Sequence, residues 1–169
     1  MWLEKETVSW SEADTDVTKG KIISLYSKWL PKSIVIDADG LGYPIWISLK
    51  KAIDRIIGFR GASKPQSKYA INARADGYLA LKDYIEKGYL KLTDKNSIRQ
   101  LEYIKQVYKP NGLIGIQDKK ELRKLHNESP DFADCAMMAL YVINFCANSI
   151  IKNNLETETY VNSEFEPFE

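Results

Sequence analysis

The strongest constraint on the fold is an apolar segment that opens with two carboxylates. Residues 135–147 carry no charged side chain, so they are expected to form a helix buried against a sheet or other helices. Ser129 fits the N-cap position, Pro130 the first helical position and Asp131 the first turn, where an anion complements the helix dipole. Asp134 then faces a dry neighbourhood. An unpaired buried carboxylate is costly, so a cation, a network of donors or a metal ion is expected beside it.

A second acidic element follows the short apolar run Ser33–Ile36. The run ends in Asp37, and two glycines follow within five residues, which is typical of a central strand that stops at a tight turn. Ligands gather at the carboxyl ends of strands in open α/β sheets, so Asp37 is a candidate for chemistry. If the acidic helix packs beside this strand, Asp37 and Asp134, with Asp131 nearby, form one anionic pocket suited to a hard divalent cation such as Mg²⁺.

Each of these polar residues also has an ordinary structural interpretation. Asp131 taken alone is an acid that complements a helix dipole, and Asp37 taken alone ends a strand and starts a turn. Asp39 is better interpreted as a turn residue than as a ligand, because Asp-Gly is a turn pair. The single His126 is either a general acid or base or a solvated loop residue, and the sequence identifies no partner for it.

Length and charge set further limits. A chain of 169 residues is the size of one domain, and we predict a folded body over residues 1–150 with an acidic, mobile tail over 151–169. The net charge of +1 hides a partition, because residues 17–150 hold 22 of the 24 Lys and Arg but only 13 of the 23 Asp and Glu. A basic body favours phosphate-rich partners, although any single basic cluster is also explained as a solvated face.

The sequence shows neither a signal peptide nor a membrane span. Its first six residues include charges and no apolar core, and the apolar run near the C-terminus is too short to cross a bilayer, so we expect a soluble, cytoplasmic protein without a membrane partner. Cys135 and Cys146 lie roughly 16 Å apart along the predicted helix, beyond disulfide reach, and are expected to be reduced and buried. Two Cys and one His are too few for a zinc site.

Predicted strands and helices alternate along the chain, which favours an α/β fold. Apolar runs predict strands at 33–37, 55–59, 89–92 and 113–117, with residues 1–10 as an extended arm. Apolar spacing and caps predict helices at about 15–30, 42–52, 69–87, 94–107 and 119–124, and from 130 onwards. Asp14 and Asp94 are expected to cap the helices that follow them, and Gly88 to follow the helix over 69–87 in a left-handed conformation.

The order of several motifs resembles a known family. The motifs are Asp14-Thr15, the strand that leads into Asp37-Ala38-Asp39-Gly40-Leu41-Gly42, Asn72–Asp76, Leu113–Gln117 followed by Lys119–Arg123, and Ser129–Asp134. Together they resemble the C-terminal nuclease domain of the large terminase subunit of tailed bacteriophages, over roughly residues 10–145. The resemblance implies a ribonuclease-H-like α/β fold, with a mixed central β-sheet flanked by helices. It also implies a metal-dependent endonuclease that cuts concatemeric double-stranded DNA during packaging.

Family site residues carry over by position. The resemblance makes Asp37 and Asp134 catalytic, metal-binding residues and Asp131 a neighbouring acid that assists the metal, with two Mg²⁺ or Mn²⁺ ions as cofactors. It places Lys119 near the DNA backbone. The candidate DNA-binding residues are Lys119, Lys120, Arg123, Lys64 and Arg60. The portal and the small terminase subunit are the partners that a full-length terminase would have.

The sequence departs from the family pattern in two ways. The family carries a further catalytic Asp upstream of the segment that Trp2–Trp10 resembles, so we interpret the chain as N-terminally truncated, with Asp39, Glu4 or Glu6 as candidate replacements. The sequence also lacks a Walker A pattern. An alternative to an active nuclease is therefore an impaired remnant that serves as a DNA-binding or assembly module. A weaker alternative takes residues 39–42 as part of a nucleotide-binding loop.

Overall fold

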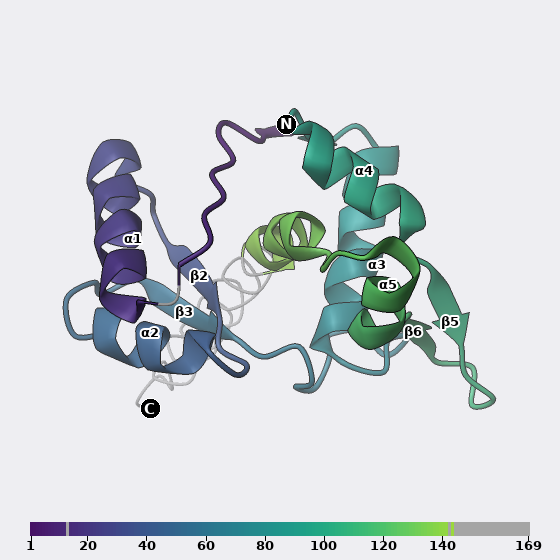
Figure 1. The fold of residues 1–169 in the computed structure, drawn as a ribbon. Coiled ribbons are helices and arrows are strands. Elements are labelled where there is room, and N and C mark those ends of the chain that lie inside the picture. The colour runs from purple at the N-terminus through teal and green to yellow at the C-terminus, as the bar shows by residue number, and fades with distance from the viewer. Residues whose placement is uncertain (13, 142, 144–169) are drawn as a thin grey trace, which may run out of the picture.

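The structure, a computed structural model, describes residues 1–12, 14–141 and 143. Its elements are β1 (Trp2–Leu3), α1 (Thr15–Trp29), β2 (Ile34–Asp37), α2 (Gly42–Leu49), β3 (Ile56–Phe59), α3 (Ala73–Glu86), β4 (Leu90–Lys91), α4 (Lys95–Tyr103), β5 (Gln106–Tyr108), β6 (Ile114–Ile116) and α5 (Lys119–His126). A further helix covers residues 131–141. In Figure 1 this helix lies between one half built from α1, α2, β2 and β3 and another built from α3, α4, α5 and the remaining strands.

The described strands pair as three two-stranded sheets. β2 and β3 are parallel, with Asp37 opposite Phe59, and β1 and β4 are also parallel. β5 and β6 are antiparallel. Because β2 and β3 run in the same direction, their carboxyl ends share one edge. The turn after Asp37 and the loop after Phe59 therefore lie side by side, and this edge carries the candidate site.

The larger hydrophobic core lies around the helix over residues 131–141. Its buried members are Phe59, Ala73, Tyr78, Leu81, Ala133, Met137, Met138 and Leu140. The helix crosses α3 so closely that a Cβ on Gly77 would lie 2.4 Å from the Met137 sulfur. One turn further along the same face, the Tyr141 ring meets Phe59 of β3 edge to face, with ring centroids 5.4 Å apart. The helix is thereby held against both halves of the molecule.

The N-terminal segment ties the two halves together. The Glu4 carboxylate accepts hydrogen bonds from the backbone amides of Thr93 and Asp94, at 2.6 and 2.7 Å, where α4 begins. Two residues later, Glu6 accepts hydrogen bonds of 2.7 and 2.8 Å from the Lys28 ammonium in the last turn of α1. Figure 1 shows this segment running from the α4 side of the molecule to α1. The pair of glutamates therefore links α4 to α1 across the molecule.

The prediction of a helix through Val107 is wrong. The helix ends at Tyr103, and Val107 lies in β5, opposite Gly115 of β6. The turn between the two strands contains Gly112 with a φ of 79°, a conformation that glycine adopts without steric cost. A β-prone run has formed a hairpin with a later segment, although its local apolar spacing also fits a helix.

Other boundaries differ less. The helix predicted over 69–87 begins at Ala73, because the Asn72 side chain caps an amide of its first turn at 2.9 Å. The residues before it form a loop, held by two loop amides that donate to the buried Asp76 carboxylate. Gly88, predicted to follow this helix in a left-handed conformation, has a φ of 70°. The extended arm over residues 1–10 is a strand only at β1.

Two further predictions fall on residues that the structure does not describe. The tail over 151–169 and Cys146 lie outside the described residues, and the domain boundary stays a prediction. Within the described part of the chain, no helix is long and apolar enough to cross a membrane.

Gly58 of β3 lies beneath the Trp46 indole, where an added Cβ would stand 2.7 Å from one ring atom. We expect Gly58→Ala to lower the free energy of unfolding by about 1–3 kcal/mol, because the rigid ring must move. The matched control is Gly20→Ala in α1, where no atom lies within 4 Å. That change should raise stability by about 0.5–1 kcal/mol, because alanine favours a helix. Urea denaturation measures both, and equal effects would contradict the prediction.

Candidate metal centre

Asp37 ends β2 in a turn that its own side chain organises. Its Oδ1 accepts the backbone amide of Asp39 at 3.0 Å. Asp39 in turn accepts the amide of Gly61, from the loop after β3, at 2.9 Å. Gly42 packs so tightly that a Cβ would lie 1.7 Å from the Asp37 carbonyl oxygen. Asp39 and Gly42 therefore build the turn, as expected for Asp39, while the other carboxylate oxygen of Asp37 faces Lys119.

Asp134 reaches the same place from the helix over residues 131–141 and is only 4% exposed. Its Oδ1 accepts hydrogen bonds from the Tyr78 hydroxyl at 2.7 Å and from Arg74 Nε at 3.3 Å, both on α3. Its Oδ2 is buried and accepts no hydrogen bond within the described residues, although the Lys119 ammonium lies 2.8 Å away. The expectation that a buried Asp134 requires cations and donors is confirmed.

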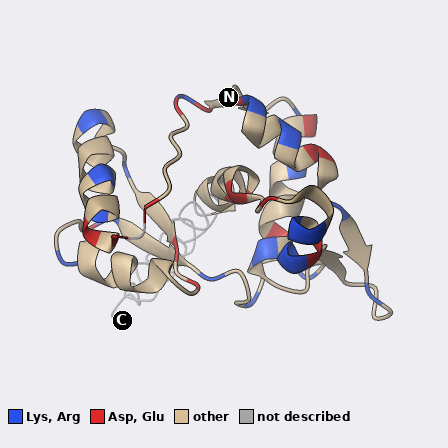
Figure 2. Ribbon diagram, in the orientation of Figure 1, with Lys and Arg blue, Asp and Glu red and all other residues tan. Residues whose placement is uncertain are grey.

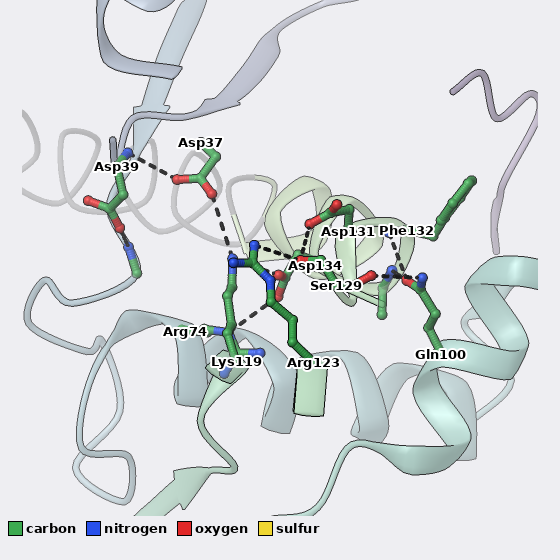
Figure 3. A network of polar contacts seen from close by, with 12 residues as sticks. Asp37, Asp39, Arg74, Gln100, Lys119, Arg123, Ser129, Asp131, Phe132 and Asp134 are labelled. Carbon is green, nitrogen blue, oxygen red and sulfur yellow. Dashed lines mark hydrogen bonds and ion pairs between the residues drawn. The ribbon is translucent and has the colours of Figure 1, made fainter. Parts of the chain in front are cut away.

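Lys119 joins the two carboxylates. Its Nζ lies 3.8 Å from Asp37 Oδ2 and 2.8 Å from Asp134 Oδ2, and Figure 3 shows it between them. Lys119 opens α5, whose start is set by Asp118, which accepts the Lys120 amide at 2.7 Å. Two acids from distant elements thus converge on one positive charge.

Two neighbouring groups report the electrostatics of the site. Burial and the negative charge of Asp134 raise the pKa of the Tyr78 hydroxyl well above its usual value, so Tyr78 remains a proton donor to that carboxylate. The pKa of the Cys135 thiol is raised to about 11. The largest cause is the loss of hydration around the thiol, and the negative charges of Asp134, Asp131 and Asp37 add to it. The prediction that Cys135 is buried is wrong, because part of its surface is exposed. Because its pKa is raised, the thiol is neutral at pH 7.

Asp131 stands apart from the other two acids. It is exposed, and its carboxylate accepts the Ser129 hydroxyl at 2.6 Å. In the part of the chain that the structure describes, no group of three or more His, Cys, Asp or Glu side chains surrounds one metal position. The structure therefore unites Asp37 with Asp134 and leaves Asp131 about one helical turn away.

The Asp37–Asp134 pair nevertheless fits a hard divalent ion. Mg²⁺ is commonly held by one or two carboxylates, with waters and phosphate oxygens completing its coordination. Asp134 Oδ2 is a buried oxygen without a hydrogen bond, and the Lys119 ammonium already stands as a monovalent cation between the two acids. Asp37 and Asp134 are thus the residues that would hold such an ion.

Basic side chains line the same cleft. The charged residues on its wall are Asp37, Asp39, Arg74, Lys109, Asp118, Lys119, Lys120, Glu121, Arg123 and Asp134. Figure 2 shows Lys and Arg concentrated on α5, beside the acidic start of the helix over 131–141. Arg60 and Lys64 are not part of the wall. They lie on either side of Gly61 and Ala62, and these two residues do line the cleft. The candidate DNA-binding residues therefore form two groups, one inside the cleft and one at its margin.

The start of the acidic helix is set by Gln100, which the sequence analysis did not identify. Gln100 is 1% exposed, and its Oε1 accepts the amides of Phe132 and Ala133 at 2.9 and 3.1 Å. Its Nε2 donates to the Ser129 carbonyl at 3.0 Å. The predicted N-cap role of Ser129 is wrong, because its hydroxyl donates to Asp131 instead. The available signal was a glutamine on the apolar side of a predicted amphipathic helix.

Arg74 and Tyr78 were also given no role in advance. They lie four residues apart in α3, a spacing that puts both side chains on one helix face. Arg74 Nη1 also donates to the Gln117 carbonyl at 3.2 Å, just before α5. The sequence signals were this spacing and, for Arg74, its place in the Asn72–Asp76 motif, and neither reveals what the face contacts.

Glu4, Glu6 and His126, the remaining candidate residues, have their partners away from the Asp37–Asp134 pair. Glu4 and Glu6 are bound at the start of α4 and the end of α1, so they do not complete the carboxylate pair. His126 lies in the last turn of α5 rather than in a loop. Its ring stacks on Tyr103, with centroids 3.9 Å apart.

A family model for the terminase RNaseH-like domain matches residues 5–142. The chain belongs to this family. Among solved structures, this terminase domain is similar to the nuclease domain of the large terminase subunit gp2 of bacterial virus Sf6, with a TM-score of 0.60, 22% identity, and 75% of this chain and 70% of that chain covered. The predicted RNase-H-like fold is confirmed.

Two structures of one variant of that Sf6 domain, in which a lysine is changed to alanine, are similar as well. The one with manganese has a TM-score of 0.61 and 20% identity, covering 75% of this terminase domain and 71% of that chain. The one with calcium has the same TM-score and identity, covering 75% and 70%. No curated protein matches the chain.

Gln100→Leu should lower the free energy of unfolding of this terminase domain by about 2–4 kcal/mol, because it leaves two buried amides without an acceptor. Glu102→Gln, an exposed change on the same helix, is the matched control and should leave stability unchanged. Urea denaturation compares the two variants. A loss below about 0.5 kcal/mol for Gln100→Leu would show that the glutamine does not fix the start of the acidic helix.

Proposed function

We propose that this terminase domain is a divalent-metal-dependent endonuclease that cuts double-stranded DNA during phage genome packaging. The observation that carries the proposal is the convergence of Asp37 and Asp134 on the Lys119 ammonium. Two carboxylates from separate elements repel each other unless a cation lies between them, so their approach favours a cation-binding site. Membership of the terminase family and the manganese and calcium in similar structures support this function.

In this proposal Asp37 and Asp134 hold Mg²⁺ or Mn²⁺ in a two-ion site, and Asp131 is the neighbouring acid that assists the metal. A bound divalent ion supplies Lewis-acid activation of water and of the phosphodiester. The chain's own residues prepare the site. Tyr78 and Arg74 hold Asp134 Oδ1, which leaves Oδ2 directed at the cation position. Lys119 balances the two acids until an ion arrives.

The proposed DNA contacts are electrostatic. Lys119, Lys120 and Arg123 line the cleft beside the acids, and Arg60 and Lys64 lie at its margin. Such side chains contact phosphates, which positions a duplex without reading its sequence. We therefore propose cleavage with little sequence preference, and, in a complete packaging motor, assembly with the portal and the small terminase subunit.

One observation favours a second candidate, a DNA-binding or assembly module without catalysis. No third acid joins Asp37 and Asp134 around one position within the described residues. A site with fewer carboxylates binds divalent ions more weakly, because each lost charge and each lost ligand lowers affinity. The cleavage experiment below separates the two candidates.

We expect the purified chain to nick supercoiled plasmid with Mn²⁺ and to lose this activity in EDTA. Asp134→Asn should reduce the nicking rate by about 100-fold or more, because a metal-binding charge is lost. Asp54→Asn, at an exposed position before β3, is the matched control and should cut at the wild-type rate. Agarose gel electrophoresis measures the rate. An intact plasmid with folded wild-type protein would favour the non-catalytic module instead.

Lys119→Ala should bind Mn²⁺ about tenfold more tightly than the wild type, because the ammonium no longer competes for the two carboxylates. The neighbouring Lys120→Ala is the matched control and should change affinity little. Electron paramagnetic resonance of free Mn²⁺ measures binding without DNA. Equal or weaker binding by Lys119→Ala would mean that Lys119 does not occupy the ion's place.

A further inference from the structure

Leu41 is an exposed apolar side chain at the edge of the metal cleft. It is 88% exposed in the turn between β2 and α2, two residues beyond Asp39, which lines the cleft. The turn is pinned, because Asp37 accepts the Asp39 amide and Asp39 accepts the Gly61 amide. An isolated exposed leucine is ordinary on a protein surface. This one is held in a defined place, at the edge where the candidate chemistry takes place.

The surface next to Leu41 alternates cations and aromatic rings. The Arg60 guanidinium lies 5.4 Å from the Tyr43 ring centroid. Tyr43 meets Trp46 edge to face at 5.7 Å, and the Lys50 ammonium lies 5.3 Å from the Trp46 centroid. We call these four residues, Arg60, Tyr43, Trp46 and Lys50, the α2 ladder. Both of its ends carry a positive charge, which complements a phosphate backbone.

The α2 ladder does not suit base stacking. A platform for single-stranded nucleic acid needs open aromatic faces. Here a cation already lies over each ring, and Trp46 is half-buried against Gly58. The freely exposed apolar group is the aliphatic Leu41 instead. Aliphatic side chains of this kind enter the minor groove of duplex DNA, partly unstack one base step and bend the duplex.

We propose that Leu41 inserts into the minor groove of duplex DNA, while Arg60 and Lys50 contact the phosphates beside it. This inference deepens the proposed function and rests on it, because it takes the metal cleft as the place where a duplex binds. The basic α5 lines the cleft, and the α2 ladder adjoins its margin at Gly61. The duplex is then held on both sides of the Asp37–Asp134 pair and kinked at Leu41 toward its major groove, away from the inserted side chain.

The test measures binding and bending of a 30-base-pair duplex by the full chain in EDTA, where no cleavage occurs. Fluorescence anisotropy reports affinity, and energy transfer between dyes on the two ends reports the bend. The variants are Leu41→Ala, Leu41→Lys and the control Leu30→Ala, which removes another exposed leucine, after α1. Because both leucines are exposed, all three variants should fold, and circular dichroism verifies this.

We expect Leu41→Ala to bind the duplex about five- to tenfold more weakly and to abolish the bend, with an unchanged dependence of affinity on salt, because an apolar contact is lost. Leu41→Lys should also abolish the bend, although it adds a positive charge. Leu30→Ala should match the wild type in both readouts. Single-stranded DNA of the same length should bind equally well to Leu41→Ala and the wild type.

Four outcomes would overturn the proposal. These are an unbent duplex with the wild type, an unchanged bend in Leu41→Ala, tighter binding with the bend retained in Leu41→Lys, and an equal loss of single-stranded binding in Leu41→Ala. Plasmid nicking with Mn²⁺ tests the proposed function separately. Bending that depends on Leu41 without nicking would overturn the catalysis alone, and nicking without such bending would overturn the wedge alone.

Discussion

The burial of one carboxylate, Asp134, is the interaction on which the rest of the site depends. A carboxylate that loses its hydration needs partners of opposite charge and donors with good geometry. Tyr78 and Arg74 on α3 and Lys119 on α5 supply them. Three helices must therefore meet at one point for the apolar helix to pack. The close approach of that helix to α3 at Gly77 makes the meeting sterically possible.

The charges around Asp134 also explain how a stable fold keeps a place for an exchangeable cation. Two acids, Asp37 and Asp134, face two bases, Arg74 and Lys119, so the group is balanced. The partners differ in burial, because the side chain of Asp134 is 6% exposed and that of Lys119 is 35% exposed. A half-buried lysine on a flexible stem can move its charge into solvent, whereas the carboxylate is fixed by Tyr78. The ammonium is the member of the group that can yield to another cation.

Contacts between residues far apart in sequence hold the two halves in place around this centre. Gln100 of α4 binds the start of the acidic helix through amides 32 and 33 residues away. Glu4 and Glu6 link α4 to α1. The Gln100 and Glu4 links are hydrogen bonds to backbone amides, whereas the Glu6–Lys28 link is an exposed ion pair, which stabilises less. The relative position of Asp37 and Asp134 is thus a property of the whole domain.

The sequence by itself determined the elements whose signals are local. Asp14 and Asp94 begin helices as predicted, Gly88 follows one, and β2 ends at Asp37, because caps, turns and strand ends depend on neighbouring residues. It also identified the two acids that meet, since a carboxylate on an apolar helix demands a partner wherever it packs. Only the tertiary structure decided which partners these are. Lys119 and Gln100 owe their roles to segments distant in the chain, and no local pattern records which distant segments will touch.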